Sequence, residues 1–396
     1  MLQIIMSFEA VNIAPYLLEI NKSVDEQTNF KVKHVTFKDR NYVIMRYNKS
    51  LLSKDAYNTT GLIRSVICKD NEIVCYSPPK SIDYTMFKNQ VSPSNITSIE
   101  EYVEGTMINL FWTGDTWEIA TRSSVGGNVS FFSDDNSDGM SFRHMFLDTI
   151  ASQETSTQTD FFSSFENMPK NFCFSFVLQH PNNRIVVPFI NPSLYLVKVY
   201  EMTNGGYVNE INISSVANSL PGWVKYPEQI HTSLTELEQS MLSDTSDHNI
   251  VGAMIYGIID GTVVRTKIRN STYETVRRLR GNQPKLKYQY LMLRREGNIT
   301  EYLKYYPEHK QNFFAFRNQV HSFTLELYSL YVSCYIMRSG PLINFSIKYR
   351  NHMFNLHQLY KIQPADIKKS ITKTNVIDYV NNLHPSILMH SINIAE

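Results

Sequence analysis

Alternating apolar and polar residues mark strands in the first two thirds of the chain. Between residues 31 and 76 the pattern repeats every second residue, and β-branched residues are frequent. Asp70-Asn71 separates two such stretches, and Gly114-Asp115 separates residues 108–112 from 117–121. Each pair therefore predicts a hairpin with a tight turn. Further strands are expected at residues 172–178, 194–200, 250–259 and 262–268.

After about Asn270 the apolar spacing changes to that of amphipathic helices. Residues 353–360 and 376–383 follow this spacing, and one long helix face is expected at Phe313, Phe316, Val320, Phe323 and Leu327. The chain has 396 residues, which suits two domains because single cores stop growing at roughly 250 to 300 residues. The fold class predicted is α+β, with an antiparallel-sheet core over residues 1–283 and a helical accessory domain over 284–396.

Composition narrows the class of protein. The 38 Lys and Arg residues balance 37 Asp and Glu, which excludes a uniformly basic or acidic protein. Cys68, Cys75, Cys173 and Cys334 lie far apart without CxxC spacing, which predicts buried thiols in a reducing compartment. No stretch approaches about 18 uncharged apolar residues. We therefore expect a cytoplasmic protein with no membrane partner.

Charge is uneven along the chain. Between residues 262 and 295 the only acid is Glu274, and the ten bases are Arg265, Lys267, Arg269, Arg277, Arg278, Arg280, Lys285, Lys287, Arg294 and Arg295. Lysines and arginines neutralise phosphates, and the tyrosines interleaved with them offer faces for base stacking. The segment is a candidate nucleic-acid or nucleotide surface. The alternative is a solvated helix face whose charge is balanced elsewhere.

Five short motifs follow one another in a recognisable order. They are Glu104-Gly105-Thr106 before a strand, Thr121-Arg122-Ser123, Phe174-Ser175-Phe176 leading to Asn183-Arg184-Ile185-Val186, Val251-Gly252-Ala253, and Lys267-Ile268-Arg269. In this order they resemble the motifs of covalent nucleotidyltransferases, specifically the RNA ligases of the bacteriophage T4 type and their relatives in large DNA viruses. The resemblance covers residues 64–281, including Pro79-Lys80 upstream of the first motif.

The resemblance implies a reaction whose key residues are replaced in this chain. In the family a lysine attacks the α-phosphate of ATP, and carboxylates in the third and fourth motifs contact ribose and metal. Here Tyr102 stands at the nucleophile position, and Ser175 and Val251 stand at the two carboxylate positions. A phenol cannot form the lysyl phosphoramidate of the family.

The cations of the motifs are retained, so the resemblance implies a pocket that binds without reacting. The expected nucleotide- or RNA-binding residues are Lys80, Arg122, Arg184, Arg265, Lys267 and Arg269. Glu104 matches the acid of the first motif and would orient the pocket or contact a base or ribose. The leading hypothesis is a catalytically degenerate RNA ligase-like protein that binds RNA or a nucleotide, with no metal site. Viral proteins are further expected partners, in the host cytoplasm or the virion.

Two alternatives remain open. The chain is an active ATP-dependent RNA ligase if another lysine, such as Lys80 or Lys88, serves as nucleophile, and ATP and magnesium would then be its cofactors. It is a structural or protein-interaction module if the fold is retained around an empty pocket.

Overall fold

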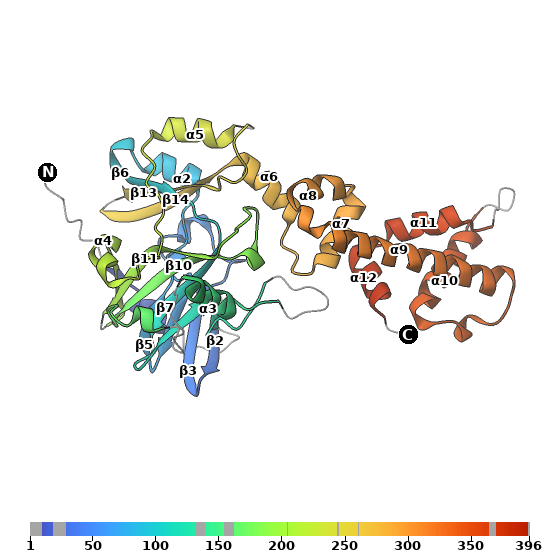
Figure 1. Cartoon of the computed structure of the whole chain (residues 1–396), viewed down its shortest axis with the longest axis horizontal. Coiled ribbons are helices and arrows are strands. Elements are labelled where there is room, and N and C mark those ends of the chain that lie inside the picture. Colours follow the sequence, from blue (N-terminus) through green and yellow to red (C-terminus); the bar gives the residue numbers. More distant parts are fainter. Residues whose placement is uncertain are drawn as a thin grey trace. The chain divides into compact units, whose positions relative to one another are not determined.

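The computed structural model describes residues 10–18, 29–131, 139–153, 162–203, 205–243, 245–259, 261–363 and 370–394. The chain forms two compact units: the larger contains Met140–Arg277 with the chain up to Phe131, and the smaller contains the chain from Arg278 on. The boundary falls inside helix α6 (Ser271–Arg280), close to the expected boundary after residue 283. Antiparallel sheets in the first unit and helices in the second confirm the α+β class (Figure 1).

The largest sheet, sheet A, has seven strands within the described residues, in the order β1-β12-β11-β10-β7-β8-β9. Their bounds are β1 Val11–Asn12, β7 Thr106–Trp112, β8 Trp117–Thr121, β9 Ser124–Val125, β10 Phe172–Gln179, β11 Ser193–Thr203 and β12 Tyr207–Ile211. All neighbours pair antiparallel. The hairpin β7–β8 is closed by the N–H of Thr113 donating to the carbonyl of Thr116 at 2.9 Å, which confirms the prediction from Gly114-Asp115.

Two smaller antiparallel sheets complete the larger unit. In the described ranges, sheet B has the order β2-β3-β4-β5 and sheet C the order β14-β13-β6. Their bounds are β2 Phe30–Phe37, β3 Arg40–Tyr47, β4 Val66–Lys69, β5 Glu72–Tyr76, β6 Ile96–Glu101, β13 Gly252–Ile259 and β14 Thr262–Arg269. The predicted turn between β4 and β5 has φ of 51° at Asp70 and 66° at Asn71, as a two-residue type I′ hairpin requires.

Helices cover the sheets of the larger unit through apolar side chains. Helix α3 (Phe142–Gln153) buries Phe146 against Phe176 of sheet A. The opposite face of sheet A packs on sheet B, where Phe111 meets Tyr42. Helices α2 (Tyr84–Gln90) and α5 (Leu234–Leu242) cover sheet C, and Figure 1 shows both beside β13 and β14. All four cysteines are free and buried, as predicted.

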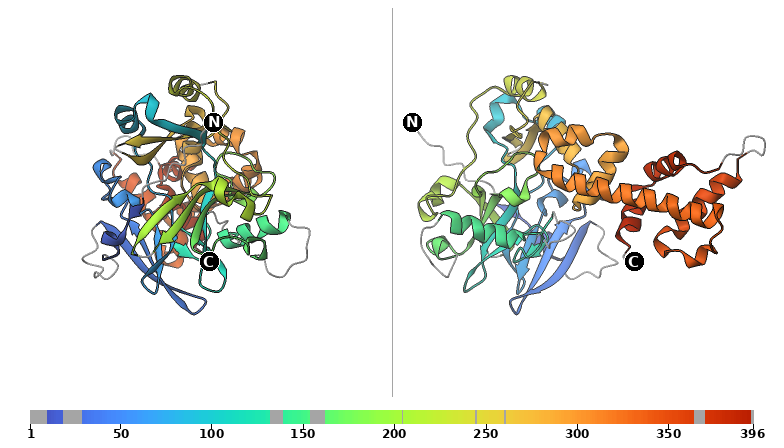
Figure 2. Two further views of the ribbon diagram at one scale, coloured as in Figure 1. Left: turned by 90° about the vertical axis from the view of Figure 1, so that its left-hand side faces the viewer. Right: turned by 45° about the vertical axis from the view of Figure 1, so that its right-hand side comes forward.

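The smaller unit is built around the long helix α9, whose predicted face is largely buried. The helices are α7 Leu286–Glu296, α8 Ile299–Tyr305, α9 Lys310–Tyr331, α10 Ile347–Lys361, α11 Lys373–Asn382 and α12 Pro385–Asn393. Phe313, Val320, Phe323 and Leu327 are buried on α9, while Phe316 is only partly covered. The right-hand view of Figure 2 shows the red helices α10 and α11 packed along α9.

The basic stretch 262–295 does not form one solvated face. Arg280 and Lys287 are buried inside the smaller unit, where Nζ of Lys287 donates to Oδ1 of Asn393 at 2.9 Å. The cations of β14 belong to the larger unit instead. Arg280 and Lys287 therefore do not belong to an exposed face of the stretch.

In the part of the chain that the structure describes, no helix combines the length and apolar character needed to span a lipid bilayer.

Candidate functional site

A cavity of about 260 Å³ in the larger unit brings together most of the residues that the motifs single out. Its walls come from strands β7, β10 and β11 of sheet A and from β6, β13 and β14 of sheet C. The polar and motif residues that line it include Arg64, Tyr102, Glu104, Val251, Arg265, Lys267, Arg269 and Tyr273. We call it the Tyr102 cavity.

Tyr102 lies directly after β6, and its phenol is held between two cations. Its hydroxyl accepts from Nζ of Lys267 at 3.4 Å and from Nη2 of Arg269 at 3.3 Å. Burial would raise the pKa of Tyr102, but the charges of Lys267 and Arg269 and their hydrogen bonds outweigh it and lower the pKa to about 8. Tyr102, Lys267 and Arg269 therefore converge on one point, where a negatively charged oxygen is favoured.

The cations of β14 reach the cavity because of the strand period. Arg265, Lys267 and Arg269 are two residues apart, so their side chains leave the same face of the strand. Arg269 forms an ion pair with Glu274 of α6, which also pairs with Arg277 at 3.3 Å. Arg269 is thus held in place by a carboxylate, whereas Lys267 meets only the phenol.

Two further cations extend this cluster. Burial lowers the pKa of Lys80, and the charges of Lys267, Arg64 and Arg265 lower it further. Burial and then Arg265 lower the pKa of Arg64 in the same way. Within the described ranges, none of Arg64, Lys80, Arg265 and Lys267 forms an ion pair with a carboxylate. The cluster therefore carries an excess of positive charge that an anion would relieve.

Glu104 lines the same cavity, and one of its two carboxylate oxygens bonds to the backbone, while the buried Oε2 has no hydrogen-bond partner among the described residues. Its Oε1 accepts from the N–H groups of Val186 at 3.0 Å and Val187 at 3.1 Å. Burial raises its pKa, while these bonds and one from Tyr273 act in the opposite direction. Gly105 allows this packing, because its φ is 149° and a Cβ there would lie 2.4 Å from the carbonyl oxygen of Leu178. Glu104 anchors the loop after β10.

The residues at the two carboxylate positions, Val251 and Ser175, differ in whether they line the cavity. Val251 lines the cavity beside Gly252, so an acid there would face the ligand space. Ser175 does not line it. Oγ of Ser175 donates to Oδ1 of Asn109 at 2.8 Å, and Nδ2 of Asn109 donates to Ser77 at 2.7 Å. On β10 the lining residue is Val177 instead, so Ser175 belongs to a buried polar chain beneath the site.

Arg122 and Arg184 do not line the Tyr102 cavity. Nε of Arg122 donates to the carbonyl of Arg64 at 3.2 Å, and its guanidinium lies 4.7 Å from the centre of the Tyr47 ring. Nε of Arg184 donates to the carbonyl of Val186 at 2.9 Å. Arg122 therefore supports the backbone of a lining residue, and Arg184 bonds to the loop that holds Glu104.

The two lysines considered as replacement nucleophiles differ in position. Lys80 belongs to the cation cluster through its electrostatic coupling to Lys267, and its ammonium lies 4.7 Å from the centre of the Tyr57 ring. Lys88 is on α2, where it pairs with Glu238 at 2.8 Å, and it does not line the Tyr102 cavity.

The sequence predicted no site role for Arg64 or Tyr256 and only a general stacking role for Tyr273, yet all three line the cavity. Arg64 lies in the region of the resemblance, yet nothing next to it in the sequence indicates that it joins the cations of β14. Tyr273 follows β14 in the basic stretch, but its contact with Glu104 depends on how α6 packs. Only the tertiary structure brings these residues to the site.

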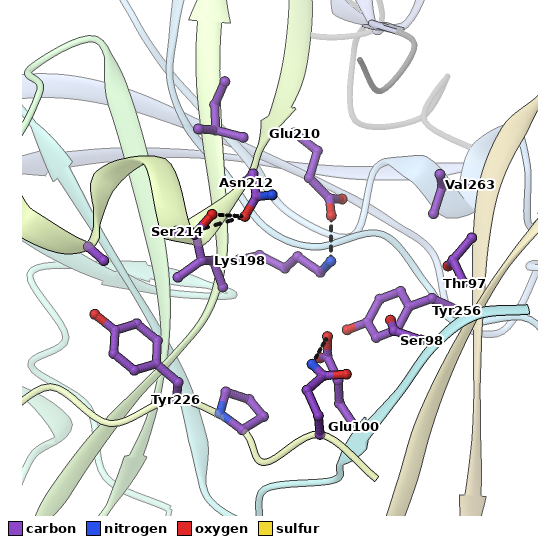
Figure 3. A pocket seen from close by; sticks show the side chains of 15 residues that line it. Thr97, Ser98, Glu100, Lys198, Glu210, Asn212, Ser214, Tyr226, Tyr256 and Val263 are labelled. Carbon is purple, nitrogen blue, oxygen red and sulfur yellow. Dashed lines mark hydrogen bonds and ion pairs between the residues drawn. The ribbon is translucent and has the colours of Figure 1, made fainter. Parts of the chain in front are cut away.

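A second cavity, of about 460 Å³, adjoins the first and is called the Lys198 cavity. Figure 3 shows Lys198 in an ion pair with Glu210, and the Lys198 ammonium lies 4.2 Å from the centre of the Tyr256 ring. Nε2 of Gln229 donates to Oε1 of Glu100 at 3.1 Å. The charged groups Lys198, Glu210 and Glu100 of this cavity therefore have partners within the protein.

At the two carboxylate positions of the motifs the Tyr102 cavity offers no ligand for a magnesium ion, although Glu100, Glu101 and Glu104 also line it. Mg²⁺ is held by carboxylates together with substrate phosphates, but Ser175 and Val251 stand at the carboxylate positions and Glu104 binds backbone N–H groups. Across the described ranges, no three His, Cys, Asp or Glu side chains gather where they could hold a metal ion.

Comparisons with known proteins give distant similarities. No known family profile matches the chain. The immediate-early protein ICP-46 homolog of Invertebrate iridescent virus 6 is 22% identical over 365 residues, covering 87% of this chain and 79% of that protein.

Among solved structures, a putative ATP-dependent DNA ligase from Aquifex aeolicus is similar with a TM-score of 0.42 and 12% identity, over 88% of this chain and 80% of that one. A Naegleria gruberi RNA ligase R4a variant in its apo form gives a TM-score of 0.33 at 10% identity, over 62% and 76% of the two chains. A Naegleria gruberi RNA ligase variant with ATP and Mn gives 0.32 at 10%, over 66% and 81%. At these scores the ligase resemblance rests on the motifs and on the cavity that they form.

Proposed function

We propose that this protein is an RNA ligase-like protein that binds a phosphorylated RNA end or a nucleotide in the Tyr102 cavity and does not ligate. The observation that carries the proposal is the cluster of Arg64, Arg265 and Lys267, three cations that line the Tyr102 cavity and have no carboxylate partner among the described residues. Lys80 does not line this cavity, but its charge is coupled to theirs. Several desolvated cations in one cavity repel one another unless an anion joins them. A phosphate offers that charge and accepts several hydrogen bonds at once.

The absence of ligation follows from the groups that face the cavity. Tyr102 stands where the family's lysine would attack ATP, and Val251 offers no carboxylate for ribose or metal. The phenol oxygen also lies between the two cations that would stabilise charge on a reacting phosphate. Binding and release are therefore the proposed activity.

The alternative function is an ATP-dependent RNA ligase that uses Lys80 as nucleophile. One observation favours it: burial and neighbouring cations lower the pKa of Lys80, which favours the neutral amine that nucleophilic attack needs. Against it, Nζ of Lys80 already donates to the carbonyl of Ser81 at 2.9 Å.

Two measurements test the proposal. Fluorescence anisotropy should show that an oligoribonucleotide with a 5′-phosphate binds more tightly than the same sequence with a 5′-hydroxyl, since only the former brings a terminal phosphate to the cations. Intact-mass spectrometry after incubation with ATP and magnesium should show no added nucleotide. An adduct that disappears in Lys80→Ala would replace the proposal by the ligase alternative, and equal affinity for the two RNAs would remove its main support.

A further inference from the structure

A third cavity, of about 230 Å³, lies beyond Arg265 and has a chemistry of its own. Four tyrosines line it, namely Tyr57, Tyr76, Tyr200 and Tyr256, together with Lys80 and Arg265. Arg265 and Tyr256 also line the Tyr102 cavity, so the two spaces share a wall. We call this space the Tyr200 cavity.

Tyr200, one of the residues that line this cavity, carries a buried polar atom without a partner among the described residues. The residue is 2% exposed, and its hydroxyl oxygen has no hydrogen-bond partner. The neighbouring Tyr76 differs, because its hydroxyl donates to the carbonyl of Leu62 at 3.0 Å. The two rings meet edge to face with centroids 5.0 Å apart. A buried hydroxyl without a partner costs about 1–3 kcal/mol, which a ligand atom bonded to it would recover.

A second unpartnered donor lies in the same wall. Nε of Arg265 is buried without a partner, although its Nη2 donates to the carbonyl of Pro79. The ammonium of Lys80 donates to Ser81 and retains further protons. The single carboxylate among the lining residues, Glu210, is neutralised by Lys198. The cavity thus offers donors and positive charge, and its carboxylate is already paired.

We propose that the Tyr200 cavity is a second ligand site, which takes a planar aromatic ring bearing an anionic group, such as a nucleoside monophosphate. The tyrosine rings provide faces and edges for the aromatic part. Lys80 and Arg265 hold the anionic part, and the Tyr200 hydroxyl bonds a polar atom of the ring system. The exposed residues Ala10, Asn58 and Thr262 mark the mouth of the cavity.

Calorimetric titration of Arg269→Glu with adenosine 5′-monophosphate tests this site, because Arg269 lines the Tyr102 cavity, does not line the Tyr200 cavity and is not among the charges that act on Lys80. One equivalent should still bind. Adding Tyr200→Phe should weaken binding about fivefold, the equivalent of one hydrogen bond of about 1 kcal/mol. Adenosine or inorganic phosphate alone should bind more weakly than the nucleotide. Tyr195→Phe is the matched control, since Tyr195 lies on the same strand outside the three cavities.

The midpoint of thermal unfolding of the unliganded protein provides a second test. Tyr200→Phe should leave the midpoint unchanged or raise it, because it removes a hydroxyl that has no partner. A lower midpoint would mean that the hydroxyl is already satisfied without ligand and would overturn the proposal. Equal nucleotide affinity with and without the Tyr200 hydroxyl would overturn it as well. The proposed function fails separately, when Lys267→Glu leaves the affinity for 5′-phosphorylated RNA unchanged.

Discussion

The Tyr102 and Lys198 cavities share Glu100, Pro227 and Tyr256, yet they differ in whether the lysine that lines them has a carboxylate partner. In the Lys198 cavity the lysine has a carboxylate partner within the fold. In the Tyr102 cavity Lys267 bonds to a phenol and lies near other cations, and among the described residues it has no ion pair with a carboxylate. A buried charge with a partner stabilises one arrangement of strands, whereas an unpartnered group of like charges costs stability and favours an anionic ligand. The contrast distinguishes structural from functional charge without reference to any relative.

Reversing the charge of the Tyr102 cavity should have the largest effect on RNA affinity. Lys267→Glu with Arg269→Glu should weaken retention of 5′-phosphorylated RNA by about three orders of magnitude at low salt, because phosphate contacts dominate the affinity. The slope of affinity against salt concentration should fall in parallel. Anisotropy titrations across a salt series measure both quantities.

Arg295→Glu is the matched control for that variant, since Arg295 belongs to the same basic stretch but is exposed in the smaller unit. It should change RNA affinity much less than the double reversal. Equal losses would mean that net charge, rather than the cavity, binds RNA.

Removing the charge of Lys198 should instead lower the stability of the fold and leave RNA affinity unchanged. Lys198→Met leaves Glu210 partly buried without its partner, which should lower the free energy of unfolding by about 3 kcal/mol. Urea denaturation followed by circular dichroism measures this change. RNA affinity of the folded fraction should stay the same. A variant that is stable but no longer binds RNA would place Lys198 among the binding residues.

The shared face of the β14 cations could be predicted because strand alternation is visible in the sequence, and the motif spacing singled out Tyr102, which lines the same cavity. Both strands of the β4–β5 hairpin could be predicted from the same alternation, and its turn from Asp70-Asn71. The depth of a side chain in a sheet could not be predicted. Ser175 and Val177 share a strand face, but only Val177 reaches the cavity, since this depends on how β7 and β10 meet the neighbouring sheet.

The basic stretch shows the other limit of sequence reasoning. Nothing in its local pattern distinguishes Lys267, which faces a cavity, from Lys287, which is buried against α12. Each side chain's environment is set by residues more than a hundred positions away, such as Tyr102 and Asn393. Charge density along a chain therefore indicates a binding segment without identifying the binding residues.

The pH dependence of RNA binding should sharpen the role of Tyr102. Its pKa is lowered from 10.0 to about 8 in the unliganded protein, and a bound phosphate competing for Lys267 and Arg269 should return it toward the ordinary value. Above pH 8 binding therefore requires proton uptake, and affinity should fall about tenfold between pH 7 and 9. Tyr102→Phe should bind without this decline, as anisotropy at each pH would measure.

The ionisation of Tyr102 should also make the free energy of unfolding depend on pH. A phenol whose pKa is depressed stabilises the folded state above the ordinary pKa, and this contribution is lost as the pH falls through about 8. Wild-type protein should therefore gain stability relative to Tyr102→Phe between pH 8 and 10. A constant difference across this range would contradict an ionisation at Tyr102.

The smallest expected effect concerns Ser175, which tests whether a motif position without its carboxylate still belongs to the site. Ser175→Ala removes the donor to Asn109 and leaves a buried carbonyl oxygen unpartnered, which should lower the free energy of unfolding by about 1 kcal/mol. RNA affinity should not change, because Ser175 does not line the Tyr102 cavity. Denaturation and anisotropy on one preparation separate the two outcomes. Unchanged stability with weakened binding would instead show that Ser175 contacts the ligand, and β10 would then contribute a second residue to the binding site.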